Sequence, residues 1–210
     1  MYNKKSLFVT FEGIEGSGKS YQSKKLFNKI RSMGLPVIYS REPGGSTSAE
    51  EIRKIILTGP KNKFTKVTDA LLYLAARNEH LEKKLRPAIL KKKIIICDRF
   101  YDSTLAYQVY GGGVDKSFVD FAHKKILGDI KPDLTFILKL NLAKAFQRVR
   151  GRRSQNRYDK FPKKFYHKVQ KSFVKIAKTN KKRCVVLDTS KDTIESERII
   201  FKKFIKVLNK

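Results

Sequence analysis

The sequence predicts an α/β protein whose parallel β-sheet is covered by helices on both faces. Short apolar runs rich in β-branched or aromatic residues alternate with longer segments in which apolar residues recur every three or four positions. A glycine-rich loop follows the first apolar run and precedes the first helical pattern. Strands that alternate with helices form βαβ units, and a strand buried on both faces has a continuous apolar sequence.

Five apolar runs are the predicted strands. Each is four or five residues long, and Cys97 and Cys184 lie inside two of them. We interpret these cysteines as small core residues, because two isolated thiols make neither a disulfide framework nor a zinc site. The predicted strands are Leu7–Phe11, Pro36–Tyr39, Ile94–Cys97, Leu134–Leu138 and Cys184–Leu187.

Four segments between and after these runs have helical spacing. The first ends before Gly34, a residue that commonly follows the last turn of a helix. In parallel sheets of this class, ligands bind beyond the carboxyl ends of the strands, so residues directly after each strand are candidate site residues. The predicted helices are Gly18–Met33, Thr68–Leu90, Lys163–Thr179 and Ile194–Leu208.

Length and composition favour one globular domain over residues 1–210. We find no linker, no repeat, and no apolar stretch of the roughly 20 residues that span a bilayer, so we expect a cytoplasmic protein without a membrane partner. Lys and Arg total 48 against 19 acidic residues, a net charge of +29. This excess indicates either a polyanionic partner such as nucleic acid, bound without sequence specificity, or a general lysine bias.

The glycine-rich loop matches the phosphate-binding pattern G-x-x-x-x-G-K-[ST], known as the P-loop. Its glycines let the backbone turn tightly and aim N–H groups at phosphate oxygens, and the following helix adds its positive end. Lys19 is expected to reach the β- and γ-phosphates of ATP, and Ser20 to bind Mg²⁺. The motif consists of Gly13, Ile14, Glu15, Gly16, Ser17, Gly18, Lys19 and Ser20.

Two further sets of charged residues suit phosphoryl transfer. Asp98 ends the strand Ile94–Cys97 and is placed to hold Mg²⁺, while Arg99 beside it can neutralise phosphate charge. The P-loop contains no arginine, so we expect a cation from elsewhere to stabilise the transferring group. The candidates lie in a polar segment, the lid, at about residues 148–160: Arg148, Arg150, Arg152, Arg153 and Arg157.

Together these motifs make the chain resemble bacterial thymidylate kinases over nearly its full length. The motifs are Phe11–Ser20, Arg41–Gly45, Leu72–Arg77 and Asp98–Gln108. The resemblance implies transfer of the ATP γ-phosphate to dTMP, giving dTDP and ADP, by a homodimer. It also implies a three-layer α/β/α P-loop NTPase fold with a five-stranded parallel sheet.

The resemblance also implies roles for individual residues. Tyr73 takes the place of the aromatic residue that stacks on thymine, Arg77 bonds a thymine carbonyl, and Gln108 reads the ring N–H and its neighbouring carbonyl. Tyr107 packs near C2′ of the sugar, and Glu12 lies near its 3′ side and the metal. Further substrate-binding candidates are Arg41, Arg53, Arg99, Ser103 and Thr104.

We expect Lys19, Arg99, Arg157 and Glu12 to be the catalytic residues. Arg157 is the expected lid cation, because the run Gln155-Asn156-Arg157 best matches the family lid. Two other functions remain open at this point: a kinase for another nucleoside monophosphate or deoxynucleoside monophosphate, and a P-loop protein that binds nucleic acid through its positive charge.

Overall fold

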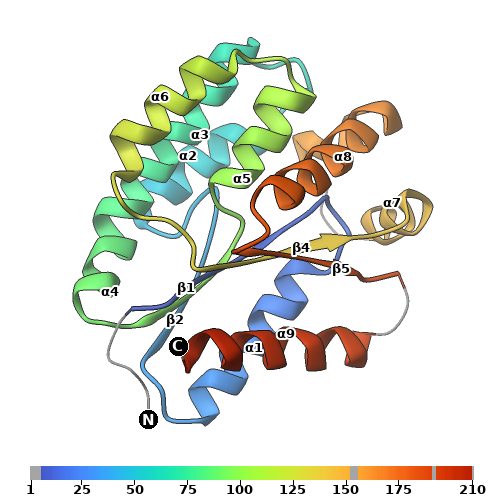
Figure 1. Cartoon of the computed structure of the whole chain (residues 1–210). Helices are drawn as coiled ribbons and strands as arrows, with labels where there is room; N and C mark the ends of the chain where they lie inside the picture. The colour runs from blue at the N-terminus through green and yellow to red at the C-terminus, as the bar shows by residue number, and fades with distance from the viewer. Residues whose placement is uncertain (1–5, 152–155, 191–192, 210) are drawn as a thin grey trace.

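The computed structural model describes residues 6–151, 156–190 and 193–209. It contains a five-stranded parallel sheet in the order β2-β3-β1-β4-β5, flanked by helices on both faces (Figure 1). The predicted three-layer α/β/α fold is therefore confirmed, and each predicted strand is present. The strands are β1 (Phe8–Glu12), β2 (Val37–Arg41), β3 (Ile94–Asp98), β4 (Leu134–Lys139) and β5 (Cys184–Asp188).

Each of the four predicted helical segments is helical in the structure, which also contains further helices that we did not predict. The predicted helix Thr68–Leu90 is a continuous helical run formed by α3, η1 and α4, in which η1 is a π-helical turn. The α-helices are α1 (Lys19–Ser32), α2 (Thr47–Leu57), α3 (Lys66–His80), α4 (Arg86–Leu90), α5 (Tyr101–Thr104), α6 (Lys116–Leu127), α7 (Leu142–Arg150), α8 (Lys163–Thr179) and α9 (Thr193–Leu208). The π-helical turns are η1 (Leu81–Leu85) and η2 (Leu105–Gly111), and a 3₁₀ turn forms η3 (Arg157–Lys160).

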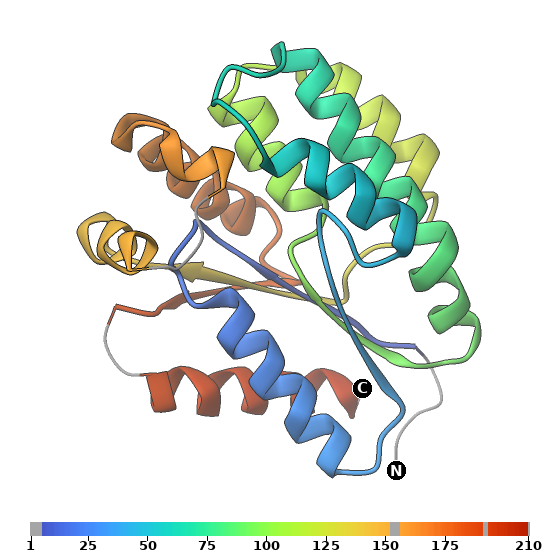
Figure 2. The same cartoon turned by 180° about the vertical axis from the view of Figure 1, so that it is seen from behind.

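Alternating side chains of the strands build two separate halves of the core. Helices α1 and α9 lie together on one face of the sheet, and α2 to α6 and α8 lie on the other (Figures 1 and 2). In β3, Ile94 and Ile96 pack with α1 and α9, whereas Ile95 and Cys97 pack with η1 and α4. This two-residue period is the pleat of a strand that is covered on both sides. Cys97 and Cys184 are free and buried, as predicted.

The register of the sheet sets up the functional edge. Asp98, the last residue of β3, pairs with Phe11 of β1 on one side and with Arg41 of β2 on the other. Because the strands are parallel, their carboxyl ends meet at one edge, and the residues that follow them converge there. No helix among the described residues has the length and apolar character needed to cross a bilayer.

Candidate functional site

A cavity of about 290 Å³ lies beyond the carboxyl ends of β1, β2 and β3. It brings together predicted residues from all four sequence motifs, which are far apart in the chain. The predicted residues in its lining are Glu15, Lys19, Ser20, Arg41, Arg53, Tyr73, Asp98, Arg99, Ser103, Tyr107 and Gln108.

The P-loop is shaped by glycines that no other residue could replace without strain. Gly13, Gly16 and Gly18 have φ angles of 140°, 77° and 91°. A Cβ atom on Gly13 would lie 2.4 Å from the carbonyl oxygen of Leu138, and one on Gly16 would lie 2.6 Å from that of Ala145. Helix α1 begins at Lys19 without a side-chain cap, which leaves its first N–H groups available to a phosphate.

The Lys19 side chain lies across the P-loop, and its amine forms hydrogen bonds to uncharged oxygen atoms. Its Nζ donates to the carbonyl oxygen of Ile14 at 2.7 Å and to Ser17 Oγ at 3.4 Å. Burial and the positive charge of Arg99 lower the pKa of Lys19 to about 7, although Asp98 and other carboxylates act in the opposite direction. A bound phosphate would supply the negative charge that favours the protonated amine.

Ser20 and Asp98 form an oxygen-rich site next to the P-loop. Ser20 Oγ donates a hydrogen bond to Asp98 Oδ2. The other carboxylate oxygen, Asp98 Oδ1, is buried and has no partner among the described residues. Mg²⁺ prefers oxygen ligands and is usually held by one or two protein groups together with substrate phosphates, so this pair fits the ion. No cluster of three or more His, Cys, Asp or Glu that could hold a metal occurs in the described part of the chain.

Arg99 joins the P-loop to the helical turn that follows β3. Its guanidinium donates to the Gly13 carbonyl oxygen at 2.9 Å, to Ser103 Oγ at 3.1 Å and to Glu15 Oε1 at 2.8 Å. Its backbone has a φ of 73°, which is uncommon outside glycine and is found most often at functional sites. Burial tends to raise the pKa of Glu15, but Arg99 and Lys19 outweigh it and hold that pKa below its usual range.

Glu12 lies beneath the cavity and is fully buried. It accepts hydrogen bonds from the Phe100 backbone N–H at 2.8 Å and from Ser103 Oγ at 2.5 Å. Burial, followed by the nearby Asp102 carboxylate, raises the pKa of Glu12 to about 8. Glu12 is therefore largely protonated at neutral pH, and in this structure it supports the residues of the site without lining the cavity.

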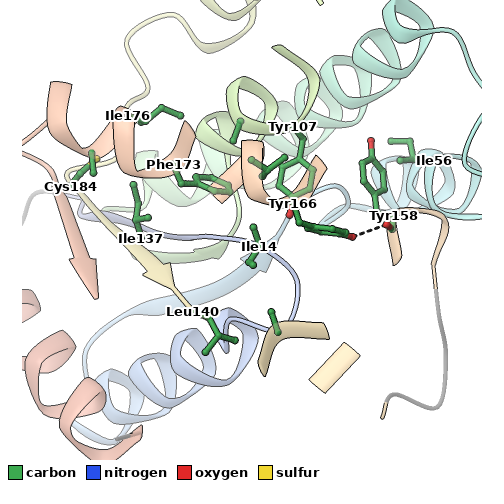
Figure 3. Close-up of a cluster of buried hydrophobic side chains, with 14 of the residues drawn as sticks. Ile14, Ile56, Tyr107, Ile137, Leu140, Tyr158, Tyr166, Phe173, Ile176 and Cys184 are labelled. Atoms are coloured by element: carbon green, nitrogen blue, oxygen red, sulfur yellow. Dashed lines mark hydrogen bonds between the residues drawn. The ribbon is translucent and has the colours of Figure 1, made fainter. Parts of the chain in front are cut away.

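At the opposite end of the cavity, aromatic rings and one amide form a slot. Tyr73 and Tyr107 both line it and each contacts Tyr158 edge to face, with ring centroids 6.1 and 5.7 Å apart. Figure 3 shows Tyr107 and Tyr158 in the buried cluster that also contains Tyr166, whose hydroxyl donates to the Tyr158 carbonyl oxygen at 2.6 Å. Gln108, on η2, completes this end of the cavity.

Arg77 is not among the residues that line the cavity, and its expected contact with a base stays a prediction. Arg77 is 2% exposed and donates to Glu42 Oε2 at 2.8 and 2.6 Å and to Thr104 Oγ1 at 2.8 Å. Its Nη1 is 2.9 Å from His123 Nε2, and burial together with Arg77 lowers the pKa of His123 to about 3, so the neutral imidazole accepts this bond. A buried guanidinium needs a carboxylate partner, and Glu42 provides it. Thr104, also predicted to bind substrate, is occupied in the same network.

Two of the lid arginines, Arg157 and Arg148, make different contacts, and the expected catalytic role of Arg157 stays a prediction. Arg157 is 2% exposed, pairs with Asp69, and donates to the Ile56 carbonyl oxygen at 2.8 Å, outside the cavity lining. Arg148, at the end of α7, instead donates to the carbonyl oxygen of Gly16 in the P-loop at 3.1 Å. Arg152 and Arg153 lie outside the described residues.

Several residues of the cavity were not predicted. Glu42 and Pro43 follow β2 directly, so the rule that ligands bind after strand ends would have found them. Leu57 and Tyr158 come from α2 and η3, which only tertiary packing brings to the cavity. The unpredicted lining residues are Lys24, Tyr39, Glu42, Pro43, Leu57, Asn156 and Tyr158.

Comparison with known proteins finds that this chain is similar to thymidylate kinases in both sequence and structure. A family model described as thymidylate kinase matches residues 11–200. The thymidylate kinase of Wolbachia pipientis is 41% identical over 202 residues, covering 93% of this chain and 99% of that protein. The thymidylate kinase of Afipia carboxidovorans is 39% identical over 196 residues, covering 91% and 86%. The crystal structure of thymidylate kinase from Ehrlichia chaffeensis superposes with a TM-score of 0.77 at 35% identity, covering 97% of this chain and 99% of that one.

The raised pKa of Glu12 predicts a pH dependence of stability. The folded state binds a proton at Glu12 up to pH of about 8, whereas the unfolded chain releases it near 4.5. The stabilisation is therefore complete below pH 4.5 and is lost as the pH rises through 8. Glu12→Gln, which mimics the protonated acid, should reduce the loss of unfolding free energy between pH 5 and 8 by about 1 kcal/mol or more, measured by urea denaturation.

The matched control for this experiment is Glu82→Gln, at a side chain that is 49% exposed. Its stability profile should stay parallel to that of the wild type. Parallel profiles for Glu12→Gln as well would show that Glu12 does not carry the proton.

Proposed function

This chain belongs to the thymidylate kinase family, and from that membership we propose how its own residues carry out the reaction. It is a transferase that uses ATP to phosphorylate dTMP to dTDP. The observation that carries the proposal is the two-ended cavity: a phosphate-binding loop with an oxygen pair for a metal at one end, and an aromatic slot with one amide at the other.

At the donor end, the P-loop backbone and Lys19 bind the ATP phosphates. Ser20 and Asp98 would hold Mg²⁺, which when bound neutralises charge on the phosphates. The buried and unpartnered Asp98 Oδ1 supports this assignment. In phosphoryl transfer of this kind the protein does little covalent chemistry. These residues therefore act mainly by positioning the phosphates and by neutralising their charge.

At the acceptor end, three arginines surround the place for the dTMP phosphate. Arg99 is fixed by its bonds to the P-loop and to Glu15. Arg41 lines the cavity with half of its side chain exposed and pairs with Glu50 at 3.0 Å. Arg53 also lines the cavity and donates to the Pro43 carbonyl oxygen at 2.6 Å. A phosphate could be exchanged for these weak or neutral partners at Arg41 and Arg53.

The base lies in the aromatic slot. Tyr73 offers a π-face for stacking, and Gln108 offers an amide to the hydrogen-bonding edge of the base. Within the slot, the Tyr107 hydroxyl accepts a hydrogen bond from Arg99 Nη2 at 3.3 Å, a placement that suits contact with the sugar. Arg77 donates a hydrogen bond to Glu42, which lines the cavity, and so it helps to fix the position of that carboxylate.

The transferring group needs a cation that reaches it from the lid. Arg148 donates a hydrogen bond to the carbonyl oxygen of Gly16 in the P-loop. Because Arg148 is exposed, its side chain can turn toward a phosphate bound at this loop. Arg157 has its donors committed to Asp69 and to backbone carbonyls. In our proposal Arg148 supplies the charge, and Arg157, the residue chosen from sequence, anchors the lid.

We extend the proposal to the assembly and the location. Val67 and Leu71 on α3 and Phe121 on the neighbouring α6 are 51%, 49% and 63% exposed, and an apolar surface of this kind suits a homodimer contact. Both cysteines are free, as is usual in the reducing cytoplasm.

The substrate assignment is tested by ADP release from ATP with a panel of nucleoside monophosphates: dTMP, dUMP, dCMP, dGMP and dAMP. We expect dTMP to have the highest kcat/KM, because Tyr73 offers a ring for stacking and Gln108 reads the edge of the base. Absence of dTMP turnover, or a higher kcat/KM for another nucleotide, would reject the assignment and leave the P-loop interpretation intact.

The two lid arginines are separated by a pair of variants. Arg148→Ala should lower kcat by about tenfold or more, within the large range of effects known for arginine fingers, with an unchanged melting temperature. Arg157→Ala should lower the melting temperature, since it leaves Asp69 without its buried cation. The reverse pattern, a large loss of kcat confined to Arg157→Ala, would restore the assignment made from sequence.

A further inference from the structure

A single carboxylate on α3 contacts three residues at the base end of the cavity. Asp69 Oδ2 accepts hydrogen bonds from Gln108 Nε2 at 3.1 Å and from the Tyr158 hydroxyl at 2.7 Å. Its other oxygen, Oδ1, accepts from Arg157 Nη2. Asp69 therefore connects the side chain that faces the base with two residues of the lid.

These contacts fix which way the Gln108 amide faces. Both of its N–H groups are used, because Nε2 donates to Asp69 and also to the Tyr158 hydroxyl at 2.8 Å. The Tyr158 hydroxyl gives its own proton to Asp69, so it can accept from Gln108. A reversed amide would place its oxygen against a carboxylate that has no proton to donate, and both partners would lose their bonds.

The amide oxygen of Gln108 is left for the ligand. Gln108 is 4% exposed and lines the cavity, and its Oε1 has no hydrogen-bond partner among the residues that the structure describes. An acceptor at this place pairs with a ring N–H, which thymine and uracil carry at N3. Cytosine presents a lone pair at the same ring position, and a buried acceptor that faces a lone pair leaves both groups unpaired.

We propose that Asp69 is a positioning residue that sets the base specificity of the site by holding the Gln108 amide with its oxygen toward the base. This inference rests on the proposed function, because it takes a pyrimidine nucleotide as the acceptor. The lid then also contributes to base specificity, because the Tyr158 hydroxyl is the second group that holds the Gln108 amide.

The direct test is Asp69→Asn, assayed with dTMP and dCMP. An asparagine can offer either its oxygen or its amino group, so Gln108 is free to reverse. We expect KM for dTMP to rise, KM for ATP to stay within about twofold, and the dTMP-to-dCMP ratio of kcat/KM to fall by about tenfold or more, because leaving one buried polar group unpaired disfavours binding by about this factor or more. The matched control is Asp120→Asn on α6, an exposed carboxylate that pairs with Lys116, and this variant should keep the wild-type ratio.

A second variant covers the case in which Asp69→Asn unfolds, since Asp69 also neutralises the buried Arg157. Tyr158→Phe keeps the Asp69–Arg157 pair and removes only the hydroxyl that holds the second N–H of Gln108. It should lower the dTMP-to-dCMP ratio by a factor of about three or more while its melting temperature stays close to that of the wild type.

These measurements test the role of Asp69 and the proposed function separately. A wild-type ratio in Tyr158→Phe and in any folded Asp69→Asn protein, with changes only in melting temperature, overturns the role of Asp69 and leaves the dTMP kinase assignment standing. A wild-type enzyme that does not phosphorylate dTMP overturns the proposed function and this inference together.

Discussion

The burial of positive charge at the carboxyl edge of the sheet is the constraint on which the rest of the site depends. A guanidinium taken out of water is tolerated only when a carboxylate and further acceptors surround it. This chain has 19 acidic residues against 48 basic ones, yet several of its carboxylates are gathered here. The buried or partly buried pairs at this edge are Arg77 with Glu42, Arg99 with Glu15 and Arg157 with Asp69.

Each pair gives a part of the site its shape. Arg99 with Glu15 ties the P-loop to the turn after β3, and Arg157 with Asp69 docks the lid on α3. Lys19 differs from these arginines, because it is buried without a carboxylate in hydrogen-bond contact among the described residues. Its pKa falls to about 7 for that reason, and the phosphates of ATP are the counter-charge that would complete its environment.

The fold, the P-loop and the Asp98–Arg99 strand end follow from local sequence, whereas Tyr73, Tyr107 and Gln108 were predicted from the family resemblance. Strands buried on both faces are recognisable as apolar runs, and the P-loop and Asp98 take their positions from the strand ends that precede them. The sequence did not indicate the burial of Arg77 and Arg157, because their partners Glu42 and Asp69 lie 35 and 88 positions away along the chain. Local patterns report spacing along one element, whereas ion pairs between elements depend on how those elements pack.

The most direct test of this view is the protonation of Lys19 when ATP binds. Titration calorimetry with Mg²⁺ and ATP at pH 8, in buffers of different ionisation enthalpy, counts the protons taken up on binding. A lysine with a pKa of about 7 is mostly neutral at pH 8 in the free protein and becomes charged beside the phosphates, so we predict uptake approaching one proton per site, falling toward zero at pH 6. Binding at pH 8 without proton uptake would contradict the account, because Lys19 would then carry its charge before the phosphates arrive.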